Sequence, residues 1–562
     1  MATRTRRAGA TRQVLSNGPW KGVRDTIEPF DDTQDLAQDA TNIYISDIVN
    51  GSGAMARAGF TLLNTGLPIY SGKGQCVYTH VALDGTAYPF IVGGGRLYRG
   101  NAGLTTFTDV TPIGVTIDPT ARVKMVSLGD DLIVNDSVHP PWIGSNLAST
   151  PITGTYIQYD AANSAWAAHD ITVWGGGIVA VLHQVAGVPR HSDISWSEPG
   201  TPATGWQQLD FDNNWTLEQT GSSPIYAIVG TNVALYYFRD RSIGAISGAL
   251  GPDLQTTSTH DAISFNVGTR YWASVQLFGN HIYFADIIGR AWRVALGSTP
   301  EAIWLNLRSQ ISKAPSMFPA MTEQVLCSAF EPSLNLYLLA AYTQNPALTA
   351  PPNEMYSFDA RTGQYCGRWN IKGPAGVSIE SMGTLEDGLG GVRMVVLGSK
   401  TAGPAAGGWG WSFNAVTSAA SSHLISEGPK ANFITTEGGL RLSTEGQPIN
   451  WTDDGALPDI SLTTNRLGYA SDVSWIIDRC TVVTGSPDPV QVAMRTSAQP
   501  LTVEGVPTPG ISSDQTYRLV CGARIVGRGT QVTVKPMRVT GQWSLSQISV
   551  VAMPSQARPE DA

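Results

Sequence analysis

The most crowded set of side chains that could carry out acid–base chemistry lies in the stretch HSDISWSEPGTPATGW, residues 191–206. An imidazole and a carboxylate in one cleft can transfer protons during catalysis, and the stretch holds His191, Asp193 and Glu198. Alternation along a strand would place His191, Asp193 and Ser195 on one face. Polar residues at a turn or strand edge explain the same set equally well, and no other histidine stands at a catalytic spacing. We therefore assign no catalytic residue.

A second stretch, DFDNNWTLE, begins like a calcium-binding loop, with oxygen-bearing side chains at Asp210, Asp212 and Asn214. The glycine at the sixth position and the glutamate at the twelfth, which such a loop requires, are replaced by Trp215 and Gly221. A turn held by the aspartate and asparagine side chains is the better interpretation.

Other signatures of chemistry are missing from the sequence. The glycine groups in VGGGRLYRG and VWGGGIVAV lack the spacing of phosphate-binding loops, and no G-x-S-x-G occurs. The cysteines form no C-x-x-C pair, which argues against a zinc site or a disulfide framework and favours buried thiols made in a reducing compartment. They are Cys76, Cys327, Cys366, Cys480 and Cys521. The sequence predicts a protein that is not an enzyme and that holds neither a cofactor nor a metal.

The two tryptophans of the first stretch, Trp196 and Trp206, could stack on a sugar ring or fill the space between neighbouring sheets. We favour packing, because each indole buries a large apolar area. The stretch is then a structural corner. Ile194 and Trp196 face an interface between sheets, Pro199 and Gly200 turn the chain, and Trp206 closes the corner.

One phrase returns along the middle of the chain: a polar or glycine-containing turn followed by an apolar strand, as in LGDDLIVND and FGNHIYFAD. The steps between successive phrases bracket the roughly 40–50 residues of a four-stranded propeller blade. Amphipathic helices are nearly absent. The sequence therefore predicts an all-β fold with a β-propeller of six to eight blades, seven being favoured. The apolar anchors of the seven phrases are Tyr98, Ile133, Val179, Tyr236, Tyr283, Tyr337 and Val395.

The pattern also predicts the order of domains. Residues 17–74 form an N-terminal segment, in which Asp32 or Thr33 caps a short helix through Ala40 and NIYISDI is a first strand. Period-two alternation near the C-terminus predicts a β-sandwich or barrel-like domain. The expected divisions are a basic flexible arm at 1–16, the N-terminal segment at 17–74, the propeller at 75–414, a linker at 415–432, the C-terminal β domain at 433–554 and a polar tail at 555–562.

Charge limits the partners that the body of the protein can bind. The net charge is −9 and only 14% of residues are charged, so bulk electrostatics do not favour nucleic acid, whereas contacts with neighbouring subunits are favoured. The exception is a basic arm that is either solvated or ordered against a subunit or DNA. Its arginines are Arg4, Arg6, Arg7 and Arg12. No apolar run approaches the length of a membrane-spanning helix.

Several phrases resemble those of bacteriophage tail proteins. ISWSEPGTPATGW is similar to an Ile-x-Trp-Ser-x-x-Gly-x-Pro-x-x-x-Trp phrase of phage β-propellers, and FITTEGGLRLSTEG adds another fragment of the kind. GPWKGVRD, ATNIYI and AMARAGF resemble the opening of the same proteins, the tail nozzle or distal tail-tube family of short-tailed phages. The residues that carry this second likeness are Gly18, Gly22, Ala40, Asn42, Arg57, Gly59 and Phe60.

The resemblance implies a virion structural protein, assembled in the host cytoplasm, that forms a homohexameric ring at the tip of the tail. It implies contacts with a tail adaptor protein and with a tail fibre or spike protein, and phage DNA passing through the lumen during ejection. A weakly charged, acidic wall would let DNA slide past, because few cations are present to neutralise phosphates.

Two alternatives remain open at this stage. The first is a propeller at the tail tip that binds or cleaves glycans; a sialidase-like site would need matched arginines in successive blades, which the sequence lacks. The second is another phage role for the same fold, such as a tail hub or a head-completion protein.

Overall fold

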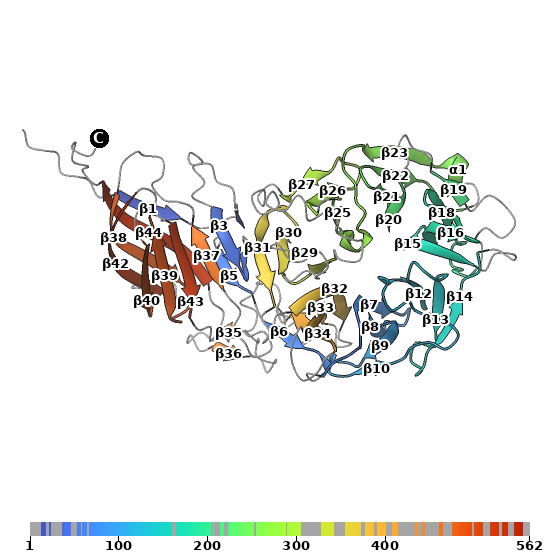
Figure 1. Cartoon of the computed structure of the whole chain (residues 1–562), viewed down its shortest axis with the longest axis horizontal. Coiled ribbons are helices and arrows are strands. Elements are labelled where there is room, and N and C mark those ends of the chain that lie inside the picture. The colour runs from blue at the N-terminus through green and yellow to red at the C-terminus, as the bar shows by residue number, and fades with distance from the viewer. Residues whose placement is uncertain are drawn as a thin grey trace, which may run out of the picture.

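The computed structural model is an all-β protein with a ring of small antiparallel sheets on one side and a pair of larger sheets on the other (Figure 1). Two very short helical turns, α1 (Leu254–Thr257) and η3 (Trp272–Ser274), interrupt the strands of the ring. The structure describes residues 13–17, 22–23, 36–46, 53–57, 59–64, 67–159, 165–203, 206, 214–217, 223–251, 254–287, 289–304, 327–341, 354–371, 377–386, 391–400, 407–413, 433–435, 441–443, 460–464, 475–496, 500–509, 517–527, 531–537 and 544–554.

Within these residues, seven four-stranded antiparallel units follow one another around the ring, which is consistent with a β-propeller. The third unit carries the short extra strand β17 (Val188–Pro189) beside its second strand.

The first unit consists of β7 (Gly74–Val81), β8 (Ala87–Gly93), β9 (Arg96–Gly100) and β10 (Phe107–Asp109), and the second of β11 (Lys124–Leu128), β12 (Asp131–Asn135), β13 (Trp142–Ser145) and β14 (Thr153–Tyr156). The third unit consists of β15 (Trp166–Trp174), β16 (Gly177–Val185), β18 (Asp193–Trp196) and β19 (Asn214–Thr216), and the fourth of β20 (Ile225–Gly230), β21 (Leu235–Arg239), β22 (Ile243–Ser247) and β23 (Thr259–Ser264).

The fifth unit consists of β24 (Gln276–Phe278), β25 (His281–Ala285), β26 (Ala291–Ala295) and β27 (Glu301–Ala302). The sixth consists of β28 (Ser328–Glu331), β29 (Leu336–Ala341), β30 (Glu354–Asp359) and β31 (Tyr365–Asn370). The seventh consists of β32 (Val377–Glu386), β33 (Val392–Lys400), β34 (Gly408–Phe413) and β6 (Phe60–Leu62).

The repeated phrase of the sequence is the turn from the first to the second strand of a unit. In LGDDLIVND and FGNHIYFAD the turn residues Gly129 and Gly279 have φ of 60° and 57°, a conformation that glycine adopts at little cost. Six of the seven anchors lie on the second strand of a unit, but Tyr98 lies on β9, the third strand of the first unit. In the first unit, the buried residue that corresponds to the other anchors is Ile91, on the second strand β8. The step from Tyr98 to Ile133 is therefore shorter than the true distance between the first two units.

The ring closes through a strand from the N-terminal part of the chain. β6 pairs with β34, with Phe60 opposite Phe413, and supplies the outermost strand of the seventh unit. The first strands of the seventh and first units, β32 and β7, lie against each other; a Cβ added at Gly383 would lie 2.6 Å from the carbonyl oxygen of Val77. This closeness is the reason for a glycine at this point in β32.

A buried carboxylate joins three successive units. Lys124 Nζ of β11 lies 2.6 Å from Asp170 Oδ1 of β15, and the amide of Ile228 on β20 donates to Asp170 Oδ2 at 2.8 Å. The Lys124 ammonium also lies 5.7 Å from the ring centroid of Trp272, in the fifth unit. The ion pair and the hydrogen bond therefore hold the first strands of the second, third and fourth units together, in addition to apolar packing.

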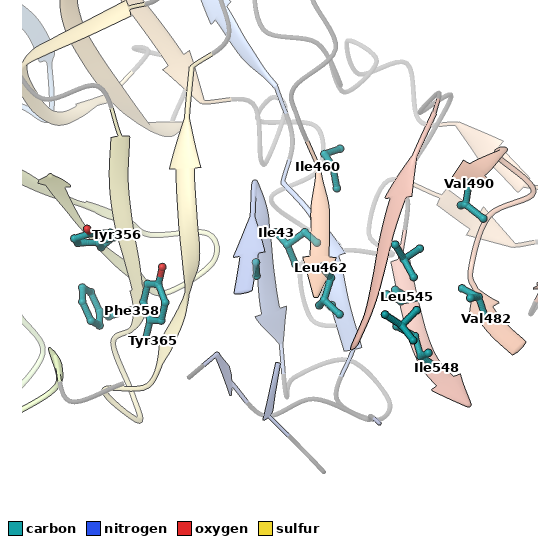
Figure 2. Close-up of a cluster of buried hydrophobic side chains, with 14 of the residues drawn as sticks. Ile43, Tyr356, Phe358, Tyr365, Ile460, Leu462, Val482, Val490, Leu545 and Ile548 are labelled. Carbon is teal, nitrogen blue, oxygen red and sulfur yellow. The ribbon is translucent and has the colours of Figure 1, made fainter. Parts of the chain in front are cut away.

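The second body contains two sheets that share one hydrophobic core, as in a β-sandwich. Figure 2 shows this core continuing from Tyr356 and Phe358 of the ring, past Ile43 and Leu462, to Ile548. One sheet has the order β4 (Ile43–Ser46), β5 (Gly53–Ala56), β44 (Ser544–Pro554), β38 (Trp475–Thr484), β42 (Tyr517–Gly527) and β41 (Thr508–Pro509), with β1 (Gln13–Asn17) beside β44. The other continues the sixth unit of the ring, because β3 (Leu36–Thr41) pairs with β31 and so joins both parts into one ten-stranded sheet. Beyond β31 this sheet has β3, β37 (Ser461–Thr464), β43 (Gln531–Pro536), β39 (Val490–Arg495) and β40 (Pro500–Gly505), with β2 (Gly22–Val23) beside β3. β35 (Phe433–Thr435) and β36 (Arg441–Ser443) pair separately.

Three expectations about the N-terminal region need correction. The helix expected through Ala40 is absent where the structure describes it, because Leu36–Thr41 is strand β3, held between β31 and β37. The expected segment 17–74 is not a separate unit, since its strands complete the sandwich and the seventh unit of the ring. The expected flexible arm at 1–16 does not include its last residues, because Gln13–Asn17 pairs with β44 as β1. In each case pairing with distant strands decided the local conformation.

Candidate functional site

The predicted corner begins with strand β18, whose side chains are buried on both faces. Ile194 and Trp196 are completely buried and pack with residues of the third and fourth units, including Ile228 and Tyr237. The indole Nε1 of Trp196 donates to the carbonyl oxygen of Gly251 at 3.2 Å. These two residues therefore lie at the interface between two consecutive sheets and are closed to an external ligand.

Trp206 packs in the opposite direction. It is 2% exposed and belongs to a cluster with Ile133 of the second unit and Trp166 of the third, whose ring centroid lies 5.3 Å away. Its Nε1 donates to the carbonyl oxygen of Pro202 at 2.8 Å. The corner thus spans three units, an arrangement that alternation along the sequence could not reveal.

The turn between the two tryptophans is exposed. Pro199 and Gly200 lie at the surface, Gly200 has φ of 77°, and its amide donates to the carbonyl oxygen of Gly176 at 2.8 Å. Glu198 is exposed, and its carbonyl oxygen accepts from the amide of Thr201 at 3.2 Å. Here only the backbone of Glu198 is engaged with the corner.

A cluster of three histidines stands beside this corner and was not recognised as a cluster in the sequence. The ring centroids of His169 and His183 are 6.1 Å apart, those of His183 and His191 are 5.1 Å apart, and Tyr226 meets His169 edge-on at 5.6 Å. The rings border a cavity of about 330 Å³ that is also lined by Ser137, Pro224 and Ile225. This is the size of a small ligand pocket.

The electrostatics of the pocket favour the neutral forms of His169 and His183. The pKa of His169 is lowered to about 4, mainly because burial disfavours the charged form and further because His183, His191 and Lys124 are nearby positive groups. Burial, and then the charge of His191, also lowers the pKa of His183. Asp193, considered above as a partner of His191, is buried and accepts from Thr216 Oγ1 at 2.7 Å. The structure therefore gives the pocket three imidazoles and no catalytic carboxylate among its described lining residues.

Stability should fall on acidification because of this cluster. An unfolded histidine titrates near 6.5, so below that pH the unfolded chain binds a proton that folded His169 does not bind until about pH 4. We expect His169 to account for a loss of about 2 kcal/mol in the free energy of unfolding between pH 7.5 and 5. Urea unfolding of His169→Gln at both pH values should show a correspondingly smaller loss; a loss equal to that of the unchanged protein would contradict this assignment.

A second group of predicted residues meets where the ring joins the sandwich. Arg57 and Asn42 are completely buried, and Arg57 Nε donates to Asn42 Oδ1 at 2.9 Å. Arg57 Nη2 donates to the carbonyl oxygen of Asn370 at 2.5 Å, and Asn42 Nδ2 donates to Asn370 Oδ1 at 2.7 Å. The guanidinium carbon lies 4.8 Å from the ring centroid of Phe60, and Trp369 Nε1 donates to the carbonyl oxygen of Ile43 at 3.0 Å. These contacts connect β31 of the ring with β4 and the start of β6.

Some of the residues singled out in the sequence are not described by the structure. Arg4, Arg6, Arg7 and Arg12 lie outside the described residues, as do Asp210 and Asp212. Among the residues that are described, no group of three or more His, Cys, Asp or Glu is arranged to hold a metal ion. Over the same ranges, no helix has the length and apolarity that crossing a membrane requires. The five cysteines are buried and none forms a disulfide.

Comparison with known proteins gives only distant structural likeness. No family model and no curated protein sequence matches the chain. The structure of U3-55K is similar with a TM-score of 0.37 and 8% identity, covering 63% of this chain and 98% of that one. Hsv2 of Kluyvelomyces marxianus has a TM-score of 0.30 and 7% identity, covering 49% and 72%. Likeness at this level carries no functional inference.

Proposed function

We propose that the chain is a structural protein of a bacteriophage tail, of the tail nozzle type, built as a seven-bladed β-propeller joined to a β-sandwich. Six copies would form a ring around the channel through which phage DNA leaves, in contact with a tail adaptor and with fibre or spike proteins. A closed ring of identical subunits satisfies every interface with one repeated contact.

The observation that carries this proposal is where the family-like residues lie. Asn42, Arg57 and Phe60, from the opening phrase, are buried at the junction between ring and sandwich. Trp196 and Trp206, from the second phrase, are buried at successive interfaces of the ring. These five residues, which resemble those of a structural family, are used for internal packing, and this use supports a scaffold role.

The same observation weighs against a glycan site at the corner. A sugar ring stacks on an indole whose face is open to solvent, whereas Trp196 and Trp206 are 0% and 2% exposed. We therefore place the glycan-binding or glycan-cleaving reading second. A tail hub or a head-completion protein of the same fold is separated from a nozzle by its copy number and position in the particle.

The test is the number of copies of the chain in purified phage particles. Quantitative mass spectrometry against the portal protein should find about six copies for every twelve portal subunits, as a single six-fold ring requires. Cryo-electron microscopy of the same particles should place the ring at the distal end of the tail. Absence of the chain from particles would overturn the proposal, and a ring next to the portal would favour a head-completion role.

A further inference from the structure

The histidine pocket lies at one end of the ring, across three consecutive units. Ser137 follows β12 of the second unit, and His183 lies near the end of β16 in the third. His191 immediately precedes β18, and Tyr226 is at the start of β20 in the fourth unit. In an antiparallel unit, the second strand ends on the same side of the sheet on which the first and third strands begin. The pocket is therefore built by tertiary packing of units and is open at one face of the ring.

The side chains around the pocket offer donors rather than negative charge. Its polar lining consists of three imidazoles, the Tyr226 phenol and the Ser137 hydroxyl. The Ser137 hydroxyl already donates its proton to the carbonyl oxygen of His169 at 3.0 Å, so the donors of the lining are the imidazole N–H groups and the phenol. No carboxylate is among the described lining residues. Such a lining complements a ligand rich in hydrogen-bond acceptors.

The carboxylates close to the pocket are already engaged by other groups. Asp136 Oδ2 lies 2.7 Å from His139 Nδ1, and Asp193 Oδ2 lies 3.4 Å from Arg190 Nη1. Asp170 is held by Lys124 at 2.6 Å. On the β20 side, Arg270 lies 5.9 Å from the Tyr226 ring centroid and forms a two-pronged ion pair with Asp240 at 2.6 and 2.7 Å. The carboxylates beside the pocket are thus engaged by other side chains, and those of Asp170, Asp193 and Asp240 are paired with Lys or Arg.

We propose that this pocket binds a phosphate-type oxyanion between His169, His183 and His191. The three imidazole rings come from separate elements, and their centroids are 5.1 and 6.1 Å apart. At this spacing, different oxygens of one tetrahedral anion can accept hydrogen bonds from different rings. A cavity of about 330 Å³ holds such an anion with room for a substituent. This inference does not depend on the proposed tail function.

Binding should strengthen on mild acidification. Burial and mutual repulsion lower the pKa values of His169 and His183 in the empty pocket, and an anion between the rings favours their protonated forms. The other titratable groups beside the cluster are Lys124, which contributes to the shift of His169, and Asp136, His139, Arg190 and Asp193. The ligand and the proton are therefore expected to bind cooperatively.

Isothermal titration of the full chain with inorganic phosphate and with dimethyl phosphate, at pH 6 and pH 8 and constant ionic strength, tests the proposal. Dimethyl phosphate keeps one negative charge at both pH values, so its affinity isolates the titration of the protein. We expect binding of at least one of them to be about tenfold tighter at pH 6. Binding of both indicates a phosphodiester, as in a nucleic acid or other polymer, as the natural source; binding of inorganic phosphate alone indicates a free phosphate or a monoester.

His183→Ala should weaken binding at pH 6 at least about tenfold, because it removes the central imidazole. His281→Ala, on β25 of the fifth unit, is the matched control and should bind like the unchanged protein. If His183→Ala fails to fold, His191→Ala replaces it. Absence of phosphate binding in folded protein, unchanged binding in both pocket variants, or tight zinc binding without phosphate binding would each overturn the proposal.

Discussion

Trp196→Ala is expected to lower the free energy of unfolding of the ring by about 3–5 kcal/mol, the cost of truncating a fully buried tryptophan. The side chain is 0% exposed and fills the interface between the third and fourth units, where it contacts the cluster that contains Ile228 and Tyr237. Its removal also leaves the carbonyl oxygen of Gly251 without the indole donor. Thermal unfolding followed by circular dichroism should show a transition lower by several degrees.

Two variants of the same corner separate packing from other effects. Trp196→Phe retains most of the apolar volume and should lose clearly less stability than the alanine variant. Thr201→Ala removes an exposed hydroxyl that donates to the carbonyl oxygen of Glu198 at 3.4 Å, and should change stability by less than about 0.5 kcal/mol. An alanine variant of Trp196 with unchanged thermal stability and lost sugar binding would reverse the assignment of this corner from structure to recognition.

Arg57→Ala is expected to uncouple the ring from the sandwich and to cost at least about 3 kcal/mol. The guanidinium is 0% exposed, donates to Asn42 Oδ1 and to the carbonyl oxygen of Asn370, and lies over the ring of Phe60. Truncation removes two charge-assisted hydrogen bonds at once and leaves their acceptors buried. Scanning calorimetry should show the sandwich unfolding at a lower temperature than in the unchanged protein, with a transition separate from that of the ring.

The matched control for Arg57 is an arginine at the surface. Arg96 is 60% exposed and pairs with Asp109 at 2.7 Å in solvent, so Arg96→Ala should leave the stability of the protein almost unchanged. Arg57→Lys keeps the charge but cannot reproduce the two directions of the guanidinium, and should resemble the alanine variant more than the unchanged protein. If both Arg57 variants unfold like the Arg96 variant, the junction does not depend on this residue.

Much of the ring was predictable because its signals are local. Alternating apolar residues after a glycine turn specify a hairpin within about ten residues, and six of seven anchors duly lie on second strands. The turn DARTG shows the same principle: Asp359 Oδ1 accepts from the amides of Arg361 and Thr362, and Gly363 has φ of 74°. Tyr98, taken as an anchor with the other six, lies instead on a third strand, because its stretch carries the same turn-and-strand pattern as a second strand.

The sequence by itself determined the class of the protein: many short strands, turns set by glycine and aspartate, and buried aromatic residues at the corner around Trp196. Tertiary structure alone decided which distant strands pair. It turned LAQDAT into strand β3 although alanine, leucine and glutamine favour a helix, closed the ring with Phe60–Leu62, and gathered His169, His183 and His191 around one pocket. The physical reason is that strand pairing and the packing of sheets depend on contacts far apart in the chain, whose gain in buried area outweighs local preference.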